Sequence, residues 1–219
     1  MKYFWFILTI LFILSCKDKN SIQGSWIYSY ELDGKGVVSF SPIPITIFDI
    51  GNESMAVFAI GNEEYEIDDY QKEYEIERIG ENFKFGDQYL LDIDSVKGDS
   101  LVLKSTNPDI DNTIVCRRLP TQKELAKWDP LNKKYRFKNW ESETVLMEFV
   151  TDSTFLEQKQ GIDNKIRKWE SMRLNNYPIL LFTYLEPTPI LVDSVNADRV
   201  YATYYGRMAN NYVFEEIKQ

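Results

Sequence analysis

Apolar and polar residues alternate along most of this chain in short segments that turn-forming residues separate. Trp26 to Leu32 alternates in this way and is followed by the turn sequence Asp33-Gly34-Lys35-Gly36. Ile45 to Ile50 and Met55 to Ile60 flank Gly51-Asn52-Glu53-Ser54, which predicts a β-hairpin. A period of two with a turn every ~10 residues is typical of an antiparallel barrel or sandwich. We therefore predict an all-β protein.

One segment near the middle of the chain has a helical pattern instead. Thr121-Gln122-Lys123-Glu124 has the form of a capping box, with Thr121 as N-cap and Glu124 three residues later. Asp129-Pro130 would end the helix, because proline cannot continue it. The pattern predicts one short helix over residues 121–128, within a linker that spans residues 120–130.

Two stretches of sequence recur at a nearly constant spacing. Residues 91–96 read Leu-Asp-Ile-Asp-Ser-Val and residues 190–195 read Ile-Leu-Val-Asp-Ser-Val, which places the matching residues 99 apart. We interpret the repeat as two tandem antiparallel β-barrel or sandwich units, residues 22–119 and 131–219. The second unit lacks the acidic stretch of the first, so we do not expect the two to be functionally equivalent.

The N-terminus has the pattern of an export signal. Lys2 precedes an almost unbroken apolar run from Tyr3 to Leu14. A run of about 12 apolar residues is too short to cross a bilayer core of roughly 30 Å as a helix. It fits the apolar region of a secretory signal peptide, which we assign to residues 1–15.

The end of this run resembles a known family signal. Ile13-Leu14-Ser15-Cys16 resembles the lipobox of bacterial lipoproteins, and the polar residues that follow resemble those of Bacteroidota-type lipoproteins. The resemblance implies cleavage before Cys16, acylation of Cys16 by palmitate or a similar chain, and a tether over residues 16–21. The chain has two cysteines, so acylation of Cys16 leaves Cys116 without an intrachain disulfide partner. We therefore expect a lipoprotein held on the lipid bilayer of the cell envelope, on the periplasmic or surface face of an outer membrane. The alternative is that residues 1–15 are an ordinary signal peptide or an uncleaved anchor.

The start of the first unit resembles a second family. Ile22-Gln23-Gly24-Ser25-Trp26 is similar to the opening Gly-x-Trp strand of lipocalin-like domains. In that family the glycine allows a tight turn at the barrel floor and the tryptophan closes the floor. The second unit has Leu131-Asn132-Lys133-Lys134-Tyr135 at the corresponding place, without the glycine and the tryptophan.

Composition excludes several kinds of chemistry. The chain has no histidine, which removes Ser-His-Asp and Cys-His catalysis and most zinc sites. Its glycines form no phosphate-binding loop. With 25 Lys and Arg against 34 Asp and Glu, the net charge of −9 disfavours binding to nucleic acid. We predict no catalytic, cofactor-binding or metal-ligating residue, and no nucleic-acid partner.

An acidic stretch is the densest charge cluster in the sequence. Eight carboxylates lie between Glu63 and Glu77, where they alternate with Tyr65, Ile67, Tyr74 and Ile76, and we expect them to share the outer face of one hairpin. Such a face can hold a hard cation such as Ca²⁺, but it is more often a solvated face that keeps a strand edge from pairing with other chains. We favour the solvated face.

The remaining signal is aromatic. Tyr177 to Phe182 and the tyrosines near the C-terminus carry enough ring surface to line an apolar barrel interior, although small barrels are more often filled by such side chains. We expect a non-enzymatic binding module for a small apolar ligand or an envelope partner. The alternatives are an interaction or inhibitor (immunity-like) lipoprotein without a ligand cavity and, third, a hydrolase that uses a pair of carboxylates.

Overall fold

The structure is a computed structural model of the 219-residue chain. It describes residues 21–39, 45–63, 66–85, 87–107, 109, 111–121, 126–139, 141–159, 162–183, 187–206 and 210–218. Within these ranges the side chains of residues 38–39, 59–63, 66–74, 85, 162, 183, 187–188 and 210 are not described. The signal peptide, Cys16 and most of the tether lie outside the described residues.

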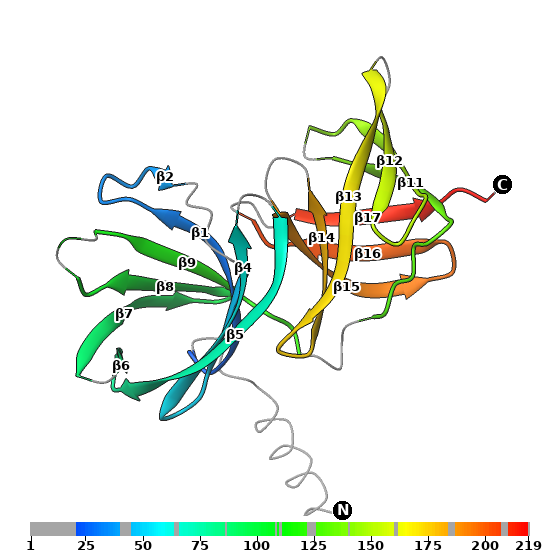
Figure 1. The fold of residues 1–219 in the computed structure, drawn as a ribbon. Coiled ribbons are helices and arrows are strands. Elements are labelled where there is room, and N and C mark those ends of the chain that lie inside the picture. Colours follow the sequence, from blue (N-terminus) through cyan, green and yellow to red (C-terminus); the bar gives the residue numbers. More distant parts are fainter. Residues whose placement is uncertain are drawn as a thin grey trace, which may run out of the picture.

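The first unit is a closed antiparallel barrel (Figure 1). Its strands are β1 (Gly24–Leu32), β2 (Val38–Ser39), β3 (Ile45–Ile50), β4 (Ser54–Glu63), β5 (Glu66–Ile79), β6 (Asn82–Phe85), β7 (Gln88–Lys97), β8 (Ser100–Ser105) and β9 (Thr113–Arg118). Strands β3 to β9 pair in chain order, and β1 pairs with both β3 and β9 to close the ring. The short strand β2 is added to β1. The predicted turn and hairpin are therefore confirmed.

The second unit is also a closed barrel. Its strands are β10 (Lys134–Lys138), β11 (Thr144–Phe149), β12 (Thr154–Lys159), β13 (Ile162–Leu174), β14 (Tyr177–Thr183), β15 (Pro187–Asn196), β16 (Arg199–Tyr204) and β17 (Asn210–Glu216). They pair in chain order, and β17 returns to β10. The prediction of an all-β chain with two tandem antiparallel units is confirmed.

The two barrels share details that support the internal repeat. The pairing of β7 with β8 shifts register at Asp94, and the pairing of β15 with β16 shifts at Asp193, 99 residues later. The turn after each bulge has one residue in the left-handed region, Gly98 (φ 58°) in the first barrel and Ala197 (φ 49°) in the second. The repeated Asp-Ser-Val sequence thus lies at the same bulge in both barrels, where one extra residue is left unpaired.

The predicted short helix between the barrels is wrong. The described residues contain no helix, and residues 126–130 form an irregular segment, while residues 122–125 lie outside the described residues. The Ala126 backbone N–H donates to the Val192 carbonyl oxygen at 3.0 Å, and the Trp128 indole N–H donates to the Tyr135 hydroxyl at 2.9 Å. Burial of Trp128 in the second barrel therefore prevails over the local helical signal, because packing outweighs the free energy of a capping box.

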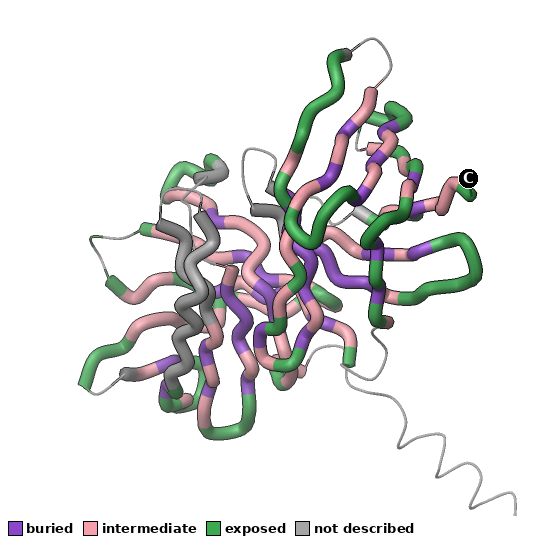
Figure 2. Tube along the Cα trace, turned by 45° about the vertical axis from the view of Figure 1, so that its right-hand side comes forward, coloured by how far each residue is buried: buried purple, intermediate pink, exposed green. Residues whose placement is uncertain are grey.

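The barrels pack against each other through an apolar cluster between their outer faces (Figure 2). Its buried members are Ile27, Ile47, Leu119, Leu174, Tyr177, Ile179, Leu181, Leu191 and Tyr205. The Ser29 hydroxyl donates to the Gly206 carbonyl oxygen at 2.6 Å across this boundary, and the Tyr177 hydroxyl donates to that of Pro120 at 3.0 Å. Strand β14 is thus buried on both faces, with Leu180 inside the second barrel and Leu181 at the boundary, which explains its continuous apolar sequence.

Candidate functional site

One end of the first barrel is closed by a tryptophan and an arginine. Trp26 is fully buried, and its indole N–H donates to the Ile22 carbonyl oxygen at 2.7 Å. Arg118, at the end of β9, places its guanidinium 4.0 Å from the centroid of the Trp26 ring. The same guanidinium donates to the carbonyl oxygens of Gln23, at 2.9 Å, and of Ser21. We call this end the floor of the first barrel.

The backbone at the floor depends on glycine. Gly24 has φ +117°, which side-chain-bearing residues rarely adopt. The turn brings the segment that begins at Ser21 under the barrel, where Arg118 binds its carbonyl groups. The predicted roles of Gly24 in the turn and of Trp26 in closing the floor agree with this geometry, whereas the part of Arg118 was not predicted.

Above the floor the first barrel has an apolar interior. The buried residues of this layer are Trp26, Phe48, Ile50, Met55, Val57, Ile76, Phe83, Leu101, Leu103 and Cys116. Cys116 is completely buried, and burial raises the pKa of its thiol. A thiol in this state is a small apolar side chain and not a nucleophile.

A buried carboxyl lies farther along β1, toward the end opposite the floor. Glu31 is 4% exposed, and it pairs directly with Ile114 of β9, which packs against the apolar interior. Directly opposed residues of an antiparallel pair lie on the same face of the sheet, so Glu31 faces the interior. Burial raises the pKa of this carboxyl. No described residue forms a hydrogen bond or an ion pair with it.

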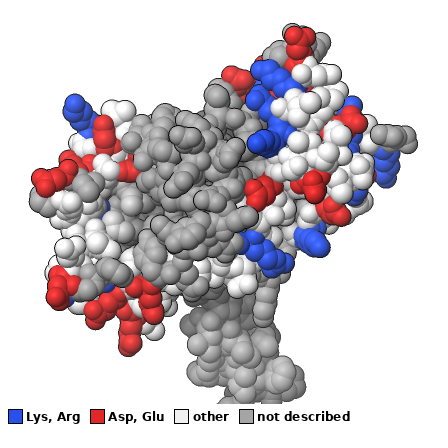
Figure 3. All heavy atoms as spheres, viewed as in Figure 1, with Lys and Arg blue, Asp and Glu red and all other residues white. Residues whose placement is uncertain are grey.

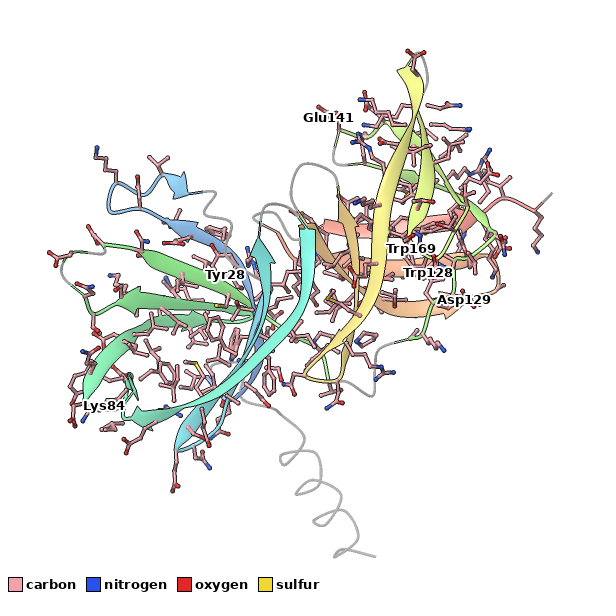
Figure 4. All side chains as sticks on the ribbon, in the orientation of Figure 1. Tyr28, Lys84, Trp128, Asp129, Glu141 and Trp169 are labelled. Carbon is pink, nitrogen blue, oxygen red and sulfur yellow. The ribbon has the colours of Figure 1, made fainter. Side chains whose placement is uncertain are left out.

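Two further polar side chains lie on the same inner face. Tyr28 is one inward position closer to the floor on β1 (Figure 4), and its hydroxyl pKa is raised by burial and, secondarily, by the charge of Glu31. Thr46 of β3 is 6% exposed and precedes the inward-facing Phe48 by two residues. Tyr28, Glu31 and Thr46 therefore form a polar group above an apolar layer, which is the arrangement of a ligand site with a few orienting groups.

A surface hollow lies beside this end of the barrel. Glu31, Ile114 and Leu103 occupy one rung of the sheet across β1, β9 and β8. Beyond this rung, where β8 ends, is a hollow of about 870 Å³ that is lined by Asn82, Gln88, Tyr89, Leu90, Asp92, Ser105, Thr106 and Asn107. One carboxyl oxygen of Asp92 is buried there without a hydrogen-bond partner among the described residues. The hollow thus has one buried carboxyl oxygen that no described residue satisfies.

The second barrel has a different interior. The described part of its core holds ten buried or half-buried aromatic rings, among them Trp128 and Trp169 (Figure 4), and Phe149 lies among them. The centroid of the Phe149 ring is 5.2 to 6.1 Å from those of five neighbouring aromatic rings: Trp128, Tyr135, Phe155, Trp169 and Phe182. Side chains therefore fill the described part of this barrel.

The second barrel also has a buried carboxyl, and this one is paired with cations. Glu157 of β12 is 3% exposed, and its oxygens lie 2.7 Å from the Arg167 guanidinium and 3.6 Å from the Lys159 ammonium. Together with Asp163 and Lys165, these groups line a small cavity of about 50 Å³. The cations neutralise Glu157 within the chain, in contrast to Glu31.

The acidic stretch does not form the hairpin that we predicted. Residues 66–79 form one continuous strand, β5, that pairs with β4. Ile76 is buried and both Glu75 and Glu77 are exposed, which agrees with a solvated outer face at that point. The other acidic side chains of the stretch lie outside the described side chains.

Comparison of the chain with protein-family models, with curated proteins and with solved structures gives no match. No helix among the described residues has the length and apolar character needed to span a bilayer. The function is therefore argued from the contacts in the two barrels.

Proposed function

We propose that this chain is a lipid-anchored, extracytoplasmic binding protein with lipocalin-like barrels. Acylated Cys16 attaches it to a membrane of the cell envelope, the first barrel receives a small apolar ligand, and the second barrel is a packed supporting body. The function is binding and not catalysis. The N-terminal sequence supports the anchor, and the Gly24, Trp26 and Arg118 floor supports the lipocalin-like assignment.

The contrast between two buried carboxyls carries the proposal. Glu157 is paired with Arg167 inside a barrel that aromatic rings fill, whereas no described residue pairs with Glu31. The Glu31 carboxyl therefore remains available to a ligand group on the inner face of the first barrel, which makes this barrel the better candidate for the binding site.

Titration with the neutral fluorescent probe N-phenyl-1-naphthylamine tests the site. We expect saturable binding of one probe by the chain from residue 17 onward, which contains both barrels. Ile114→Trp, next to Glu31, should block binding, whereas Phe137→Trp at the corresponding end of the second barrel should leave it unchanged. Loss of binding in Phe137→Trp alone would place the site in the second barrel and contradict the proposal. Labelling with radioactive palmitate, compared between the native chain and Cys16→Ser, tests the anchor.

The second candidate is an interaction or inhibitor lipoprotein without a ligand cavity. The charge distribution favours it: residues 22–119 contain 8 Lys and Arg against 19 Asp and Glu, whereas residues 131–219 contain 12 of each. Lys and Arg gather along the projecting hairpin of β12 and β13, while acidic residues lie on the first barrel (Figure 3). A stable envelope partner, together with no saturable probe binding, would favour this candidate.

A further inference from the structure

The surface hollow where β8 ends includes the outer face of the first barrel. Asn82, Asp92 and Lys104 occupy one rung across β6, β7 and β8. On the next rung, Phe83 and Leu91 belong to the apolar interior. Side chains alternate between the two faces of a sheet, so Asn82 and Asp92 point outward. The hollow that these two residues line is therefore distinct from the interior of the barrel.

Amide and hydroxyl groups line most of this hollow. They belong to Asn82, Gln88, Ser105, Thr106 and Asn107. Each amide carries a donor and an acceptor, and each hydroxyl can serve as either. No lysine or arginine is among the described residues that line the hollow, so a bound anion would meet no cation there. Such a lining suits a neutral ligand that both donates and accepts hydrogen bonds.

Hydrogen bonds fix the wall of the hollow that follows β8. The Thr106 hydroxyl donates to the carbonyl oxygen of Tyr89 on β7 at 2.6 Å. The Asn107 backbone N–H donates to the Ser105 hydroxyl oxygen at 3.2 Å, and the Asp109 N–H donates to the Asn107 side-chain oxygen at 3.0 Å. The last bond orients the Asn107 amide and leaves its NH2 group to donate. A wall that is held before binding loses little conformational entropy when a ligand binds.

One carboxylate lines the hollow, and the described residues leave part of its hydrogen-bonding capacity unused. An oxygen of Asp92 is buried without a hydrogen-bond partner among them. Lys104 pairs with Asp92 in register, but its ammonium lies 2.7 Å from the carboxylate of Asp94. A carboxylate accepts hydrogen bonds and repels another carboxylate, so the ligand must donate and must not be an acid. The described residues contain no group of three or more His, Cys, Asp or Glu that could hold a metal ion.

An aromatic ring supplies an apolar surface beside these polar groups. Tyr89 lines the hollow, and it is 52% exposed. Lys84 pairs with it in register, on the side of the first barrel that faces away from the second (Figure 4). The Lys84 ammonium lies 5.6 Å from the centroid of the Tyr89 ring and 3.9 Å from the Asp87 carboxylate. An exposed ring next to amides and a carboxylate suits a ligand with one apolar face and a polar edge. A pyranose ring has C–H groups on its faces and hydroxyls around its edge.

We propose that the hollow binds a neutral carbohydrate. One pyranose ring packs on Tyr89, and its hydroxyls donate to Asp92 and exchange hydrogen bonds with the amides of Asn82, Gln88 and Asn107. The volume of about 870 Å³ lies within the range of small-molecule sites, roughly 300–1,000 Å³, and it accommodates more than one sugar ring. This site goes beyond the apolar site proposed for the interior, and neither depends on the other.

A glycan array tests the class of ligand. The chain from residue 17 onward, detected through a C-terminal affinity tag, is applied to an array that carries neutral oligosaccharides of hexoses and N-acetylhexosamines beside sialylated, sulfated and uronic-acid glycans. We expect binding to neutral glycans alone, and we expect the best of them to compete when it is added in free form. Binding to no neutral glycan, equal binding to the acidic glycans, or no competition by the free oligosaccharide would overturn the proposal.

Substitutions at two residues then assign the binding to the hollow. Tyr89→Ala should weaken calorimetric binding of the best glycan at least about tenfold, whereas Tyr89→Phe should retain it, because the ring and not the hydroxyl packs on the sugar. Asp92→Asn should also weaken it about tenfold, since hydrogen bonds to a charged acceptor are the stronger ones. Asp152→Asn makes the same change at an exposed position of the second barrel and should have no effect.

The exposure of Tyr89 makes these tests independent of folding, because truncation of an exposed side chain changes stability little. Full affinity in both Tyr89→Ala and Asp92→Asn would place the carbohydrate elsewhere and overturn the assignment. The apolar probe N-phenyl-1-naphthylamine reports on the interior and glycans report on the hollow. Failure of this inference and failure of the proposed function can therefore be told apart.

Discussion

Replacement of Phe149 by alanine tests whether the second barrel is a packed body. Phe149 is 1% exposed, and its ring lies near those of Trp128, Phe155 and Trp169. Removal of a buried phenylalanine side chain costs ~3–5 kcal/mol, because the surrounding residues cannot close the cavity fully. The number of ring contacts places Phe149 in the upper part of this range, at ~4 kcal/mol.

Urea denaturation measured by tryptophan fluorescence gives the loss directly, since Trp128 and Trp169 both report on this core. Ile166→Ala is the control, because Ile166 is 78% exposed and its truncation should change the free energy of unfolding by less than ~0.5 kcal/mol. If Phe149→Ala does not fold, Phe149→Leu gives a smaller loss of the same sign. A loss below ~1 kcal/mol for Phe149→Ala would refute the packed interior, because it requires space that is already present around the ring.

Three further predictions concern the first barrel. Burial raises the pKa of Glu31 above its ordinary value of 4.5, so the folded state holds that proton more tightly than the unfolded state. The free energy of unfolding should therefore fall as the pH rises from this ordinary value through the raised one. Denaturation curves of Glu31→Gln should lack this part of the pH dependence. The same pH dependence in the native chain and the variant would exclude a buried carboxyl at this position. Arg118→Met should lower the free energy of unfolding by ~2 kcal/mol and increase hydrogen exchange at residues 21–24, because the floor loses its hydrogen bonds and the cation over Trp26. Cys116 is the one thiol in the chain from residue 17 onward, and it should react with iodoacetamide only after denaturation; rapid reaction of the native protein would show that the interior is open.

Much of the fold could be predicted because apolar and polar residues alternate along the strands between turn residues. The burial of β1 and β3 departs from this alternation, because Ile27 and Ile47 are also buried at the boundary between the barrels, and no periodicity of the sequence reports that contact. The repeat was visible because both barrels place an Asp-Ser pair at the same bulge. Closure of each sheet into a barrel depends instead on pairing between the first and last strands, which no local pattern reports.

The linker shows why a local signal can mislead. Thr121 to Glu124 satisfies the rule for a capping box, but the residues that follow contain Trp128, whose burial depends on Tyr135 and on rings from other strands. Helical propensity is a weak preference that tertiary contacts override. The sequence offered no means to predict where the Trp128 side chain would lie.

The candidate site was not predicted at all. Glu31 stands in the sequence as one of 34 acidic residues. A bulge between Tyr28 and Tyr30 changes the register, and as a result Glu31 faces inward opposite Ile114. Register and burial can be read only from the folded chain. The one signal in the sequence is a carboxylate in a strand shortly before a turn.

The most direct test of the central claim, that the first barrel carries a ligand, is native mass spectrometry of the chain from residue 17 onward, purified without detergent from the periplasm of an expression host. We predict a reproducible added mass that organic extraction removes, that Ile114→Trp lacks and that Phe137→Trp retains. An apo mass for the native sequence that remains unchanged after incubation with an extract of envelope lipids would contradict the account and would leave the interaction lipoprotein as the better explanation.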